Sequence, residues 1–96
     1  MAFLECNLHI MDYYKDNQLL NFWNNKFHFL KLSEENGVFN LTLDRANKKN
    51  ALHPQMINEI AFCFSYISKN PKIRLVIIRS TGDTFSAGAD LKALKN

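Results

Sequence analysis

Residues 85–92, with the sequence FSAGADLK, are the stretch whose residue types and spacing are best suited to chemistry. They follow an aliphatic run at residues 75–78, which is typical of a strand, and residues 90–95 are typical of the first turns of a helix. A strand that enters a helix through small residues leaves backbone N–H groups exposed at the helix N-terminus. Such N–H groups can stabilise negative charge on a ligand.

Three small residues and one carboxylate define what this turn can do. Ala87, Gly88 and Ala89 would let a ligand carbonyl approach the main chain closely, and Gly88 can adopt a positive φ. Asp90 is a good N-cap, because its carboxylate can accept a hydrogen bond from an N–H two or three residues further on. Taken alone, the segment is better explained as a tight strand-to-helix turn, since small residues are common in turns.

The charge of the chain is unevenly distributed, although its formal net value is only +3. Residues 1–44 hold three lysines and six acidic residues, whereas residues 45–96 hold nine basic and three acidic residues. The second half should therefore attract an anion. A nucleic acid is not expected, because the sequence has no zinc-binding pattern and no basic cluster flanked by aromatic residues. A phosphorylated cofactor is the other candidate.

The length and the cysteines limit the class of protein. Ninety-six residues allow one domain at most, and the 47% hydrophobic content is that of a globular chain. Cys6 and Cys63 lie outside any C-x-x-C motif, so we expect free, buried thiols in a reducing compartment, the cytoplasm. The N-terminus lacks the pattern of a signal peptide, and no segment is expected to enter a membrane. No metal site is predicted.

Residues 1–26 are expected to form an N-terminal extension, ahead of a domain that comprises residues 27–96. Phe22 and Trp23, with the leucines before them, could form one face of a short helix, although several asparagines disfavour a helix interior. Two interpretations stay open for this extension. It is docked through its aromatic residues, or it is an arm that binds a partner.

Hydrophobic alternation from residue 27 onward predicts a β-hairpin. Residues 27–32 and 38–43 are expected to be its strands. Asn36 and Gly37 lie between them, and this pair tolerates the positive φ angles that a type I′ turn requires.

A helix is predicted at residues 54–68, starting at Pro54 after a weak N-cap, His53. Residues at helical spacing are expected to form its buried face: Met56, Ile57, Ile60, Phe64 and Ile67. Residues 75–78 should then form a buried strand, parallel to the second strand of the hairpin. The predicted fold class is therefore α/β.

The loops at residues 44–52 and 85–92 follow consecutive parallel strands, so we expect them to lie together at one edge of the sheet. Four cations would then surround the N-terminus of the last helix: Arg45, Lys48, Lys49 and Lys92. These charges form an anion site or are ordinary solvated loop charges. The residues by themselves favour neither interpretation.

The order of these segments resembles the N-terminal part of the crotonase superfamily, the enoyl-CoA hydratase and isomerase enzymes. The resemblance covers residues 29–96 and is carried by two motifs: Asp44, Arg45, Asn50, Ala51 and Leu52 after one strand, and FSAGADL at 85–91 after the next. It implies a partial crotonase-like spiral of ββα units, made of the hairpin, the helix, the parallel strand and the start of a further helix. It also implies acyl-CoA thioester substrates, as in fatty acid metabolism, no tightly bound cofactor, and a homotrimer.

The resemblance also implies roles for single residues. In the family, two backbone N–H groups hold the enolate-like oxyanion that forms on the thioester, and one of them corresponds to Ala89. The residues that correspond to contacts with coenzyme A are Lys49, Ala51, Leu52, Ala87, Gly88, Ala89, Asp90, Leu91 and Lys92. Lys49 and Lys92 would lie near its phosphates.

This chain departs from the family pattern chiefly in length. Where this chain has Ala46, His53 and Ser80, the family commonly has proline, serine and glycine, and none of these positions is the oxyanion position. The second oxyanion donor and the acid/base carboxylates of hydratases, however, come from a later segment. Asp83, Glu59 and Asp90 are not convincing substitutes, because general acid/base catalysis needs a group of tuned pKa positioned within reach of the substrate. We therefore expect the chain to be inactive alone as a hydratase. Neither the reaction nor the acyl chain can be assigned.

Two hypotheses of different classes follow. In the first, the chain is the N-terminal fragment of an acyl-CoA enzyme, truncated before the second half of the domain. In the second, it is a stand-alone, non-catalytic module that binds a partner or a nucleotide-type anion. We favour the fragment, because the helix expected from Asp90 stops after about two turns. Such a fragment is expected to self-associate through exposed apolar surface.

Overall fold

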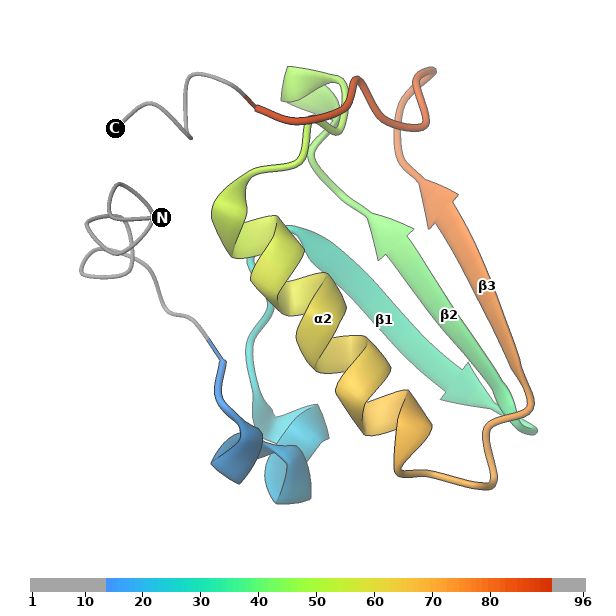
Figure 1. The fold of residues 1–96 in the computed structure, drawn as a ribbon. Coiled ribbons are helices and arrows are strands. Elements are labelled where there is room, and N and C mark those ends of the chain that lie inside the picture. Colours follow the sequence, from blue (N-terminus) through green and yellow to red (C-terminus); the bar gives the residue numbers. More distant parts are fainter. Residues whose placement is uncertain (1–13, 91–96) are drawn as a thin grey trace.

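The computed structural model describes residues 14–90, which form a three-stranded sheet and the helices beside it (Figure 1). The elements, in chain order, are the 3-10 helix η1 (Asp16–Asn24), strands β1 (Leu30–Glu35) and β2 (Val38–Leu43), the 3-10 turn η2 (Ala46–Lys48), helix α2 (Pro54–Ser68) and strand β3 (Leu75–Ser80). Apart from Asp90, the helix expected over residues 90–95, and with it Leu91 and Lys92, lies outside the described residues.

The predicted hairpin is confirmed, with a shift in its first strand. β1 and β2 pair antiparallel, so that Glu35 lies opposite Val38 and a two-residue turn joins them. Asn36 and Gly37 both have positive φ, at 53° and 80°, as that turn demands. The first strand therefore ends at Glu35, three residues later than the hydrophobic pattern indicated, because the turn geometry sets the register.

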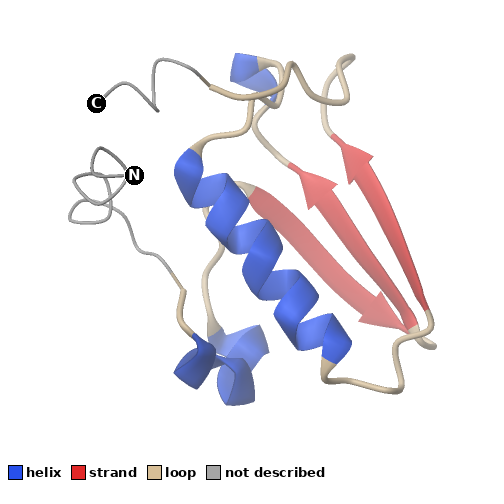
Figure 2. Cartoon of the chain, viewed as in Figure 1, coloured by secondary structure: helices blue, strands red, loops and turns tan. Residues whose placement is uncertain are grey.

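The parallel strand is also confirmed. β3 pairs parallel with β2, the strand order is β1-β2-β3, and α2 lies across one face of the sheet (Figure 2). The helix spans the predicted residues, from Pro54 to Ser68. Because a parallel connection requires a crossover, α2 returns the chain to the start of β3.

The core lies between α2 and the face of β2 that carries every second residue. Phe39, Leu41 and Leu43 are buried, and the residues between them are not, as expected for a strand with one covered face. Met56 and Phe62 of α2 complete this core from the other side.

The buried face of α2 differs from the prediction. Ile57 and Phe64 are 44% and 40% exposed, whereas Glu59 and Cys63 are fully buried beside Met56. Apolar residues occur around much of this helix, so their spacing did not single out one face. The position of Glu59 decides it, because this carboxylate binds main-chain N–H groups ahead of β1, as described below.

Residues 75–78 lie in the predicted strand, but the prediction that this strand is buried is wrong. Leu75 and Ile78 are 54% and 45% exposed. Within the described residues, β3 pairs with β2 alone, so its other edge has no neighbouring strand. An aliphatic run is typical of a central strand, but here it lies at the edge of the sheet.

The described part of the N-terminal segment is docked through aromatic residues. Phe22 is buried, and its ring stacks on Tyr66 of α2 at a centroid distance of 4.0 Å. The indole N–H of Trp23 donates to the Tyr66 hydroxyl over 3.1 Å, and that hydroxyl lies 3.1 Å from a carboxylate oxygen of Glu34 on β1. Of the two interpretations of the N-terminal extension, docking through aromatic residues is therefore confirmed for its described part. Cys6 and the rest of residues 1–13 lie outside the described residues. No helix in the described ranges has the length and apolarity needed to cross a bilayer.

Candidate functional site

The two loops predicted to meet at one edge of the sheet are joined by a parallel bridge between Leu52 and Ala89. Leu52 N–H donates to the Gly88 carbonyl over 2.7 Å, and Asp90 N–H donates to the Leu52 carbonyl over 3.1 Å. Figure 1 shows the segment that contains residues 81–90 running past η2, beyond the ends of β2 and β3. The predicted neighbourhood of the loops is therefore correct.

The bridge determines which way the main chain of Ala89 faces. In this pairing Leu52 uses both its N–H and its carbonyl, and its partners are the residues on either side of Ala89. The N–H and carbonyl of Ala89 therefore point away from the loop that contains Leu52. Ala89 is exposed, and within residues 14–90 no group accepts a hydrogen bond from its N–H. The site thus presents an outward-facing backbone donor.

Gly88 shapes the turn through its conformation. It has φ 90°, and a Cβ placed on it would meet no heavy atom within 4 Å. There is therefore space for a side chain at this position. The positive φ is what disfavours any residue other than glycine. Gly88 N–H donates to the Ser86 hydroxyl over 3.1 Å, and that hydroxyl donates to the Asn50 carbonyl over 2.9 Å. Ser86 is therefore a structural hydroxyl.

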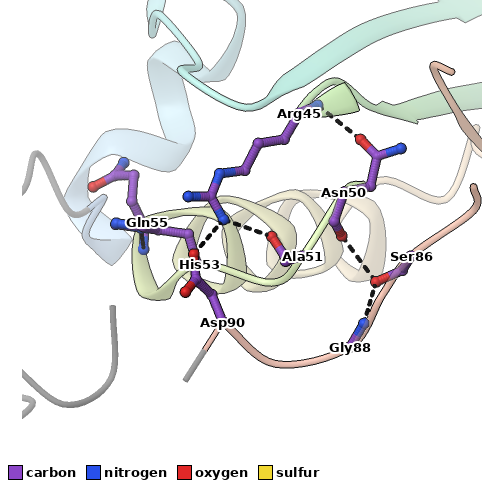
Figure 3. A network of polar contacts seen from close by, with 8 residues as sticks. All are labelled: Arg45, Asn50, Ala51, His53, Gln55, Ser86, Gly88 and Asp90. Carbon is purple, nitrogen blue, oxygen red and sulfur yellow. Dashed lines mark hydrogen bonds and ion pairs between the residues drawn. The ribbon is translucent and has the colours of Figure 1, made fainter. Parts of the chain in front are cut away.

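Asn50 connects both loops to the end of β2 and was not predicted to have a role of its own (Figure 3). Its fully buried side chain donates to the carbonyls of Thr81 and Thr84 over 2.7 and 2.9 Å and accepts from Arg45 N–H over 2.8 Å. Its φ of 53° is left-handed, a conformation that asparagine tolerates better than most residues. The sequence signal that could have indicated this role is an asparagine, which tolerates a left-handed φ, in a loop that has six polar residues.

Arg45 is not one of the free cations that the sequence suggested. Its Nη1 donates to the Asp90 carboxylate over 2.7 Å and to the Ala51 carbonyl over 2.9 Å, and its guanidinium lies 5.3 Å from the centre of the Phe29 ring. The arginine and aspartate side chains are only 11% and 16% exposed. A guanidinium that already holds a buried carboxylate is not available for a phosphate. The predicted capping role of Asp90 concerns N–H groups outside the described residues.

The two neighbouring lysines are exposed, as an anion-binding role would require. Lys48 ends η2, and Lys49 follows it with a left-handed φ of 52°. Lys49 also approaches the second loop through its main chain, because its carbonyl accepts from Ala87 N–H over 3.0 Å. Of the four predicted cations, Lys48 and Lys49 are therefore the solvated ones in the described chain.

His53 links the bridge to α2 as the N-cap of that helix. Its Nδ1 accepts from Gln55 N–H over 3.0 Å, so the imidazole caps the helix in its neutral form. Burial lowers the pKa of His53, and the positive charge of Arg45 lowers it further, against smaller opposite effects of Asp90 and Glu59. The histidine is a better cap here than its residue type suggested.

Glu59 is a structural carboxylate. It is fully buried, and it accepts from the N–H groups of His28 and Phe29 over 2.8 and 2.9 Å and from the side-chain amide of Gln55 over 3.0 Å. Burial, with a further effect of the Glu59 charge, raises the pKa of Cys63 to about 12, so this free thiol is inert. Across the described ranges, no three potential metal ligands cluster.

The candidate site therefore consists of an outward-facing N–H at Ala89, held by a bridged pair of loops, with two exposed lysines on the same edge. Such a donor can stabilise an oxygen atom on which negative charge develops. Comparison with known proteins identifies a family. The family model for enoyl-CoA hydratase/isomerase matches residues 33–96. The chain belongs to the enoyl-CoA hydratase/isomerase family.

Relatives in this family have several different names. The human mitochondrial Delta(3,5)-Delta(2,4)-dienoyl-CoA isomerase is 37% identical over 59 residues, which are 62% of this chain and 18% of that protein. The Arabidopsis thaliana 3-hydroxyisobutyryl-CoA hydrolase-like protein 5 is 36% identical over 62 residues, 64% of this chain and 16% of that protein. An isomerase and a hydrolase-like protein thus share the segment, so family membership does not select one reaction.

Solved structures of the family confirm the fold. The enoyl-CoA hydratase/isomerase from Pseudoalteromonas atlantica superposes with a TM-score of 0.69 at 35% identity, over 72% of this chain and 28% of that one. The enoyl-CoA hydratase from Shewanella pealeana gives 0.69 at 29% identity, over 81% and 29% of the two chains. The α/β arrangement is therefore part of a crotonase fold, and the chain spans less than a third of the length of these relatives.

Proposed function

We propose that residues 27–96 form the part of an enoyl-CoA hydratase/isomerase-type protein that binds an acyl-CoA thioester and stabilises negative charge on its carbonyl oxygen. The observation that carries this proposal is the orientation of the Ala89 N–H, which faces away from the Leu52 bridge and is accepted by no group in the described chain. One preorganised donor of this kind contributes roughly 3 to 4 kcal/mol to transition-state stabilisation. Coenzyme A enters as part of the substrate.

Different residues around Ala89 are proposed to contact the phosphates of coenzyme A and the thioester group. Lys49 is exposed and is the described residue proposed to lie near the phosphates of coenzyme A. The same role stays a prediction for Lys92, which lies outside the described residues. Ala87 and Gly88 leave the main chain accessible to the thioester, because they carry almost no side chain. Leu52 already uses its N–H and carbonyl in the bridge, so its contact with the ligand has to come from the side chain.

The remaining proposed contacts are constrained in the same way. The Ala51 carbonyl accepts from Arg45, and the Asp90 carboxylate is paired with that same guanidinium. We therefore propose that Ala51 and Asp90 mainly stabilise the ligand-binding loops through Arg45, and that they contribute less to direct contact with coenzyme A. The cytoplasmic location and the homotrimer stay predictions.

The 96-residue chain alone is proposed to be inactive as a hydratase. Acid/base catalysis needs a proton-transfer group within reach of the substrate, whereas the carboxylate of Glu59 is buried against main-chain N–H groups and that of Asp90 is paired with Arg45. We expect no hydration of crotonyl-CoA above the rate in buffer, measured as the loss of absorbance of the conjugated thioester. Turnover that scales with protein concentration and survives further purification would contradict this proposal.

The binding proposal is tested with the purified chain and two ligands, acetyl-CoA and coenzyme A without an acyl group. We expect both to bind, and we expect the carbonyl stretch of bound acetyl-CoA, resolved by 13C-labelling in infrared difference spectra, to move to lower frequency than in water. A hydrogen bond from Ala89 N–H polarises the carbonyl and weakens its double bond.

The variant Ala89→Pro removes the donor and serves as the critical comparison. Its bound acetyl-CoA should show the carbonyl frequency found in water. Protection of the Leu52 and Asp90 amides from hydrogen exchange serves as the control that the bridge is intact. Binding of coenzyme A without any carbonyl shift in the parent chain would instead support the alternative, a non-catalytic module for a nucleotide-type anion.

A further inference from the structure

The side chain of Arg45 lies between the two loops of the candidate site and contacts both of them (Figure 3). A single nitrogen, Nη1, donates to the Ala51 carbonyl over 2.9 Å and to the Asp90 carboxylate over 2.7 Å. The main chain of Arg45 is held at the same time, since its N–H donates to the Asn50 side chain over 2.8 Å and its carbonyl accepts from Asn50 N–H over 2.9 Å. The main chain that carries the guanidinium is therefore held in place.

Both acceptors lie next to the bridge that orients the proposed oxyanion donor. Ala51 precedes Leu52, and Asp90 follows Ala89, so each contact of Arg45 is one residue away from a bridge partner. If either loop moves, the Leu52 bridge loosens and the direction of the Ala89 N–H is no longer determined. The guanidinium thus joins the two loops at the bridge itself, whereas the contacts of Lys49 and Asn50 join them on the other side of it along the chain.

The burial of the pair makes this contact strong. The side chains of Arg45 and Asp90 are mostly buried, and the Phe29 ring covers the guanidinium. A charge-assisted hydrogen bond shielded from water is stronger than an exposed one, and removal of one partner leaves the other charge uncompensated. The bridge itself has only two main-chain hydrogen bonds.

We propose that Arg45 is a positioning residue: through Ala51 and Asp90 it holds the Leu52–Ala89 bridge and so directs the Ala89 N–H toward the thioester carbonyl. It does not bind the phosphates of coenzyme A. This inference rests on the proposed function, in which Ala89 polarises the thioester. The basic residues of the loop then have two different roles: Arg45 positions the bridge, and Lys49 binds the negative charge of the ligand.

The first arm of the test uses the ligand-free chain, so it does not depend on acyl-CoA binding. Hydrogen exchange of the Leu52 and Asp90 amides is measured by NMR in the parent chain and in Asp90→Asn and Arg45→Gln. We expect exchange at both amides to accelerate about tenfold or more in the two variants, because their acceptors lie across the bridge. Lys69→Gln removes an exposed cation at the far end of α2 and should leave both rates unchanged.

Rescue distinguishes the ion pair from a general loss of structure. Arg45→Lys keeps the charge and one nitrogen that can reach either acceptor, and it should restore part of the protection that Arg45→Gln loses. Full protection is not expected, since lysine cannot stack on Phe29 as a planar guanidinium does.

The second arm compares acetyl-CoA with coenzyme A. For Asp90→Asn we expect the carbonyl shift of bound acetyl-CoA to be lost, while affinity for coenzyme A changes less than about twofold. Lys49→Gln should give the opposite result: the carbonyl shift stays, and the affinity for both ligands falls together, most at low ionic strength. A merely structural role would not separate carbonyl polarisation from affinity in this way.

The outcomes separate the two proposals. Unchanged exchange at Leu52 and Asp90 in both Arg45→Gln and Asp90→Asn would overturn the positioning role, whatever the ligand does. A fall in coenzyme A affinity in Arg45→Gln that matches Lys49→Gln, with the carbonyl shift retained, would make Arg45 a phosphate ligand and overturn it as well. If the parent chain polarises no thioester, the proposed function fails, and with it the catalytic purpose of Arg45.

Discussion

Single buried side chains determine the geometry of the candidate site more than its exposed ones do. Asn50 binds three main-chain groups, one in its own loop and two in the segment after β3, and Ser86 adds a fourth contact through the Asn50 carbonyl. None of these side chains is proposed to touch a ligand. Their contribution is to present the main chain of residues 87–89 in one conformation, which is what a backbone oxyanion donor needs.

His53 makes this region sensitive to pH. The histidine caps α2 with an unprotonated Nδ1, and its pKa is lowered by burial and by Arg45, with Asp90 and Glu59 opposing. The unfolded chain therefore binds a proton more readily than the folded chain. The contribution of His53 to the free energy of unfolding should be complete above pH 6.5 and should decrease as the pH falls below that value.

This pH dependence can be isolated with the variant His53→Ser, which replaces the Nδ1 acceptor of the N-cap with a hydroxyl oxygen that does not titrate in this range. Urea unfolding between pH 5 and 8 should show a steeper loss of stability on acidification in the parent chain than in the variant. Parallel pH profiles for the two proteins would show that protonation of His53 does not disturb the cap.

At the scale of elements, α2 is fixed by a carboxylate that faces into the protein. Glu59 binds the N–H groups of His28 and Phe29, just before β1 begins, and this contact ties the helix to the start of the hairpin. It also rotates the helix so that Ile57 and Phe64 face outward. One polar residue therefore decides the packing of an otherwise apolar helix.

We expect Glu59→Gln to destabilise the fold by about 1 to 3 kcal/mol, because the amide leaves one partly buried N–H without an acceptor. Glu59→Leu should cost more, since both N–H groups then lose their partner. The measurement is urea unfolding followed by circular dichroism, and Glu35→Gln on the exposed side of β1 is the matched control. If Glu59→Gln were as stable as that control, the carboxylate would not hold α2 in place.

At the scale of the whole molecule, the described fold leaves apolar surface uncovered. Leu75 and Ile78 are exposed on β3, Ile57 and Phe64 on α2, and one edge of β3 has no partner strand in the described chain. Exposed apolar residues beside an unpaired strand edge favour association between chains.

The purified chain is therefore expected to self-associate, with a sedimentation coefficient that rises with concentration. The double variant Leu75→Lys/Ile78→Lys should shift this distribution toward monomer, because charged side chains on an edge strand oppose pairing. Asn47→Lys/Ser68→Lys adds the same charge at exposed polar positions and serves as the control. A sharp monomer boundary for the parent chain at all concentrations, with cooperative unfolding, would contradict this expectation.

Much of the architecture could be predicted from the sequence, because it depends on neighbours along the chain. Asn36 and Gly37 specify the hairpin turn through their own backbone preferences, and Pro54 marks the start of α2. The two loop motifs place their residues at the carboxyl ends of parallel strands, and this topology brings them together at one edge. The family follows from the same motifs.

Tertiary structure decided which side chains are partners and which faces are covered. Arg45 pairs with Asp90, and Glu59 with the main chain of residues 28 and 29, across 45 and about 30 positions of sequence. The direction of the Ala89 N–H likewise depends on its bridge to Leu52. Local periodicity and turn preferences are properties of adjacent residues, whereas burial, ion pairing and the orientation of a main-chain donor depend on segments that only the folded chain brings into contact.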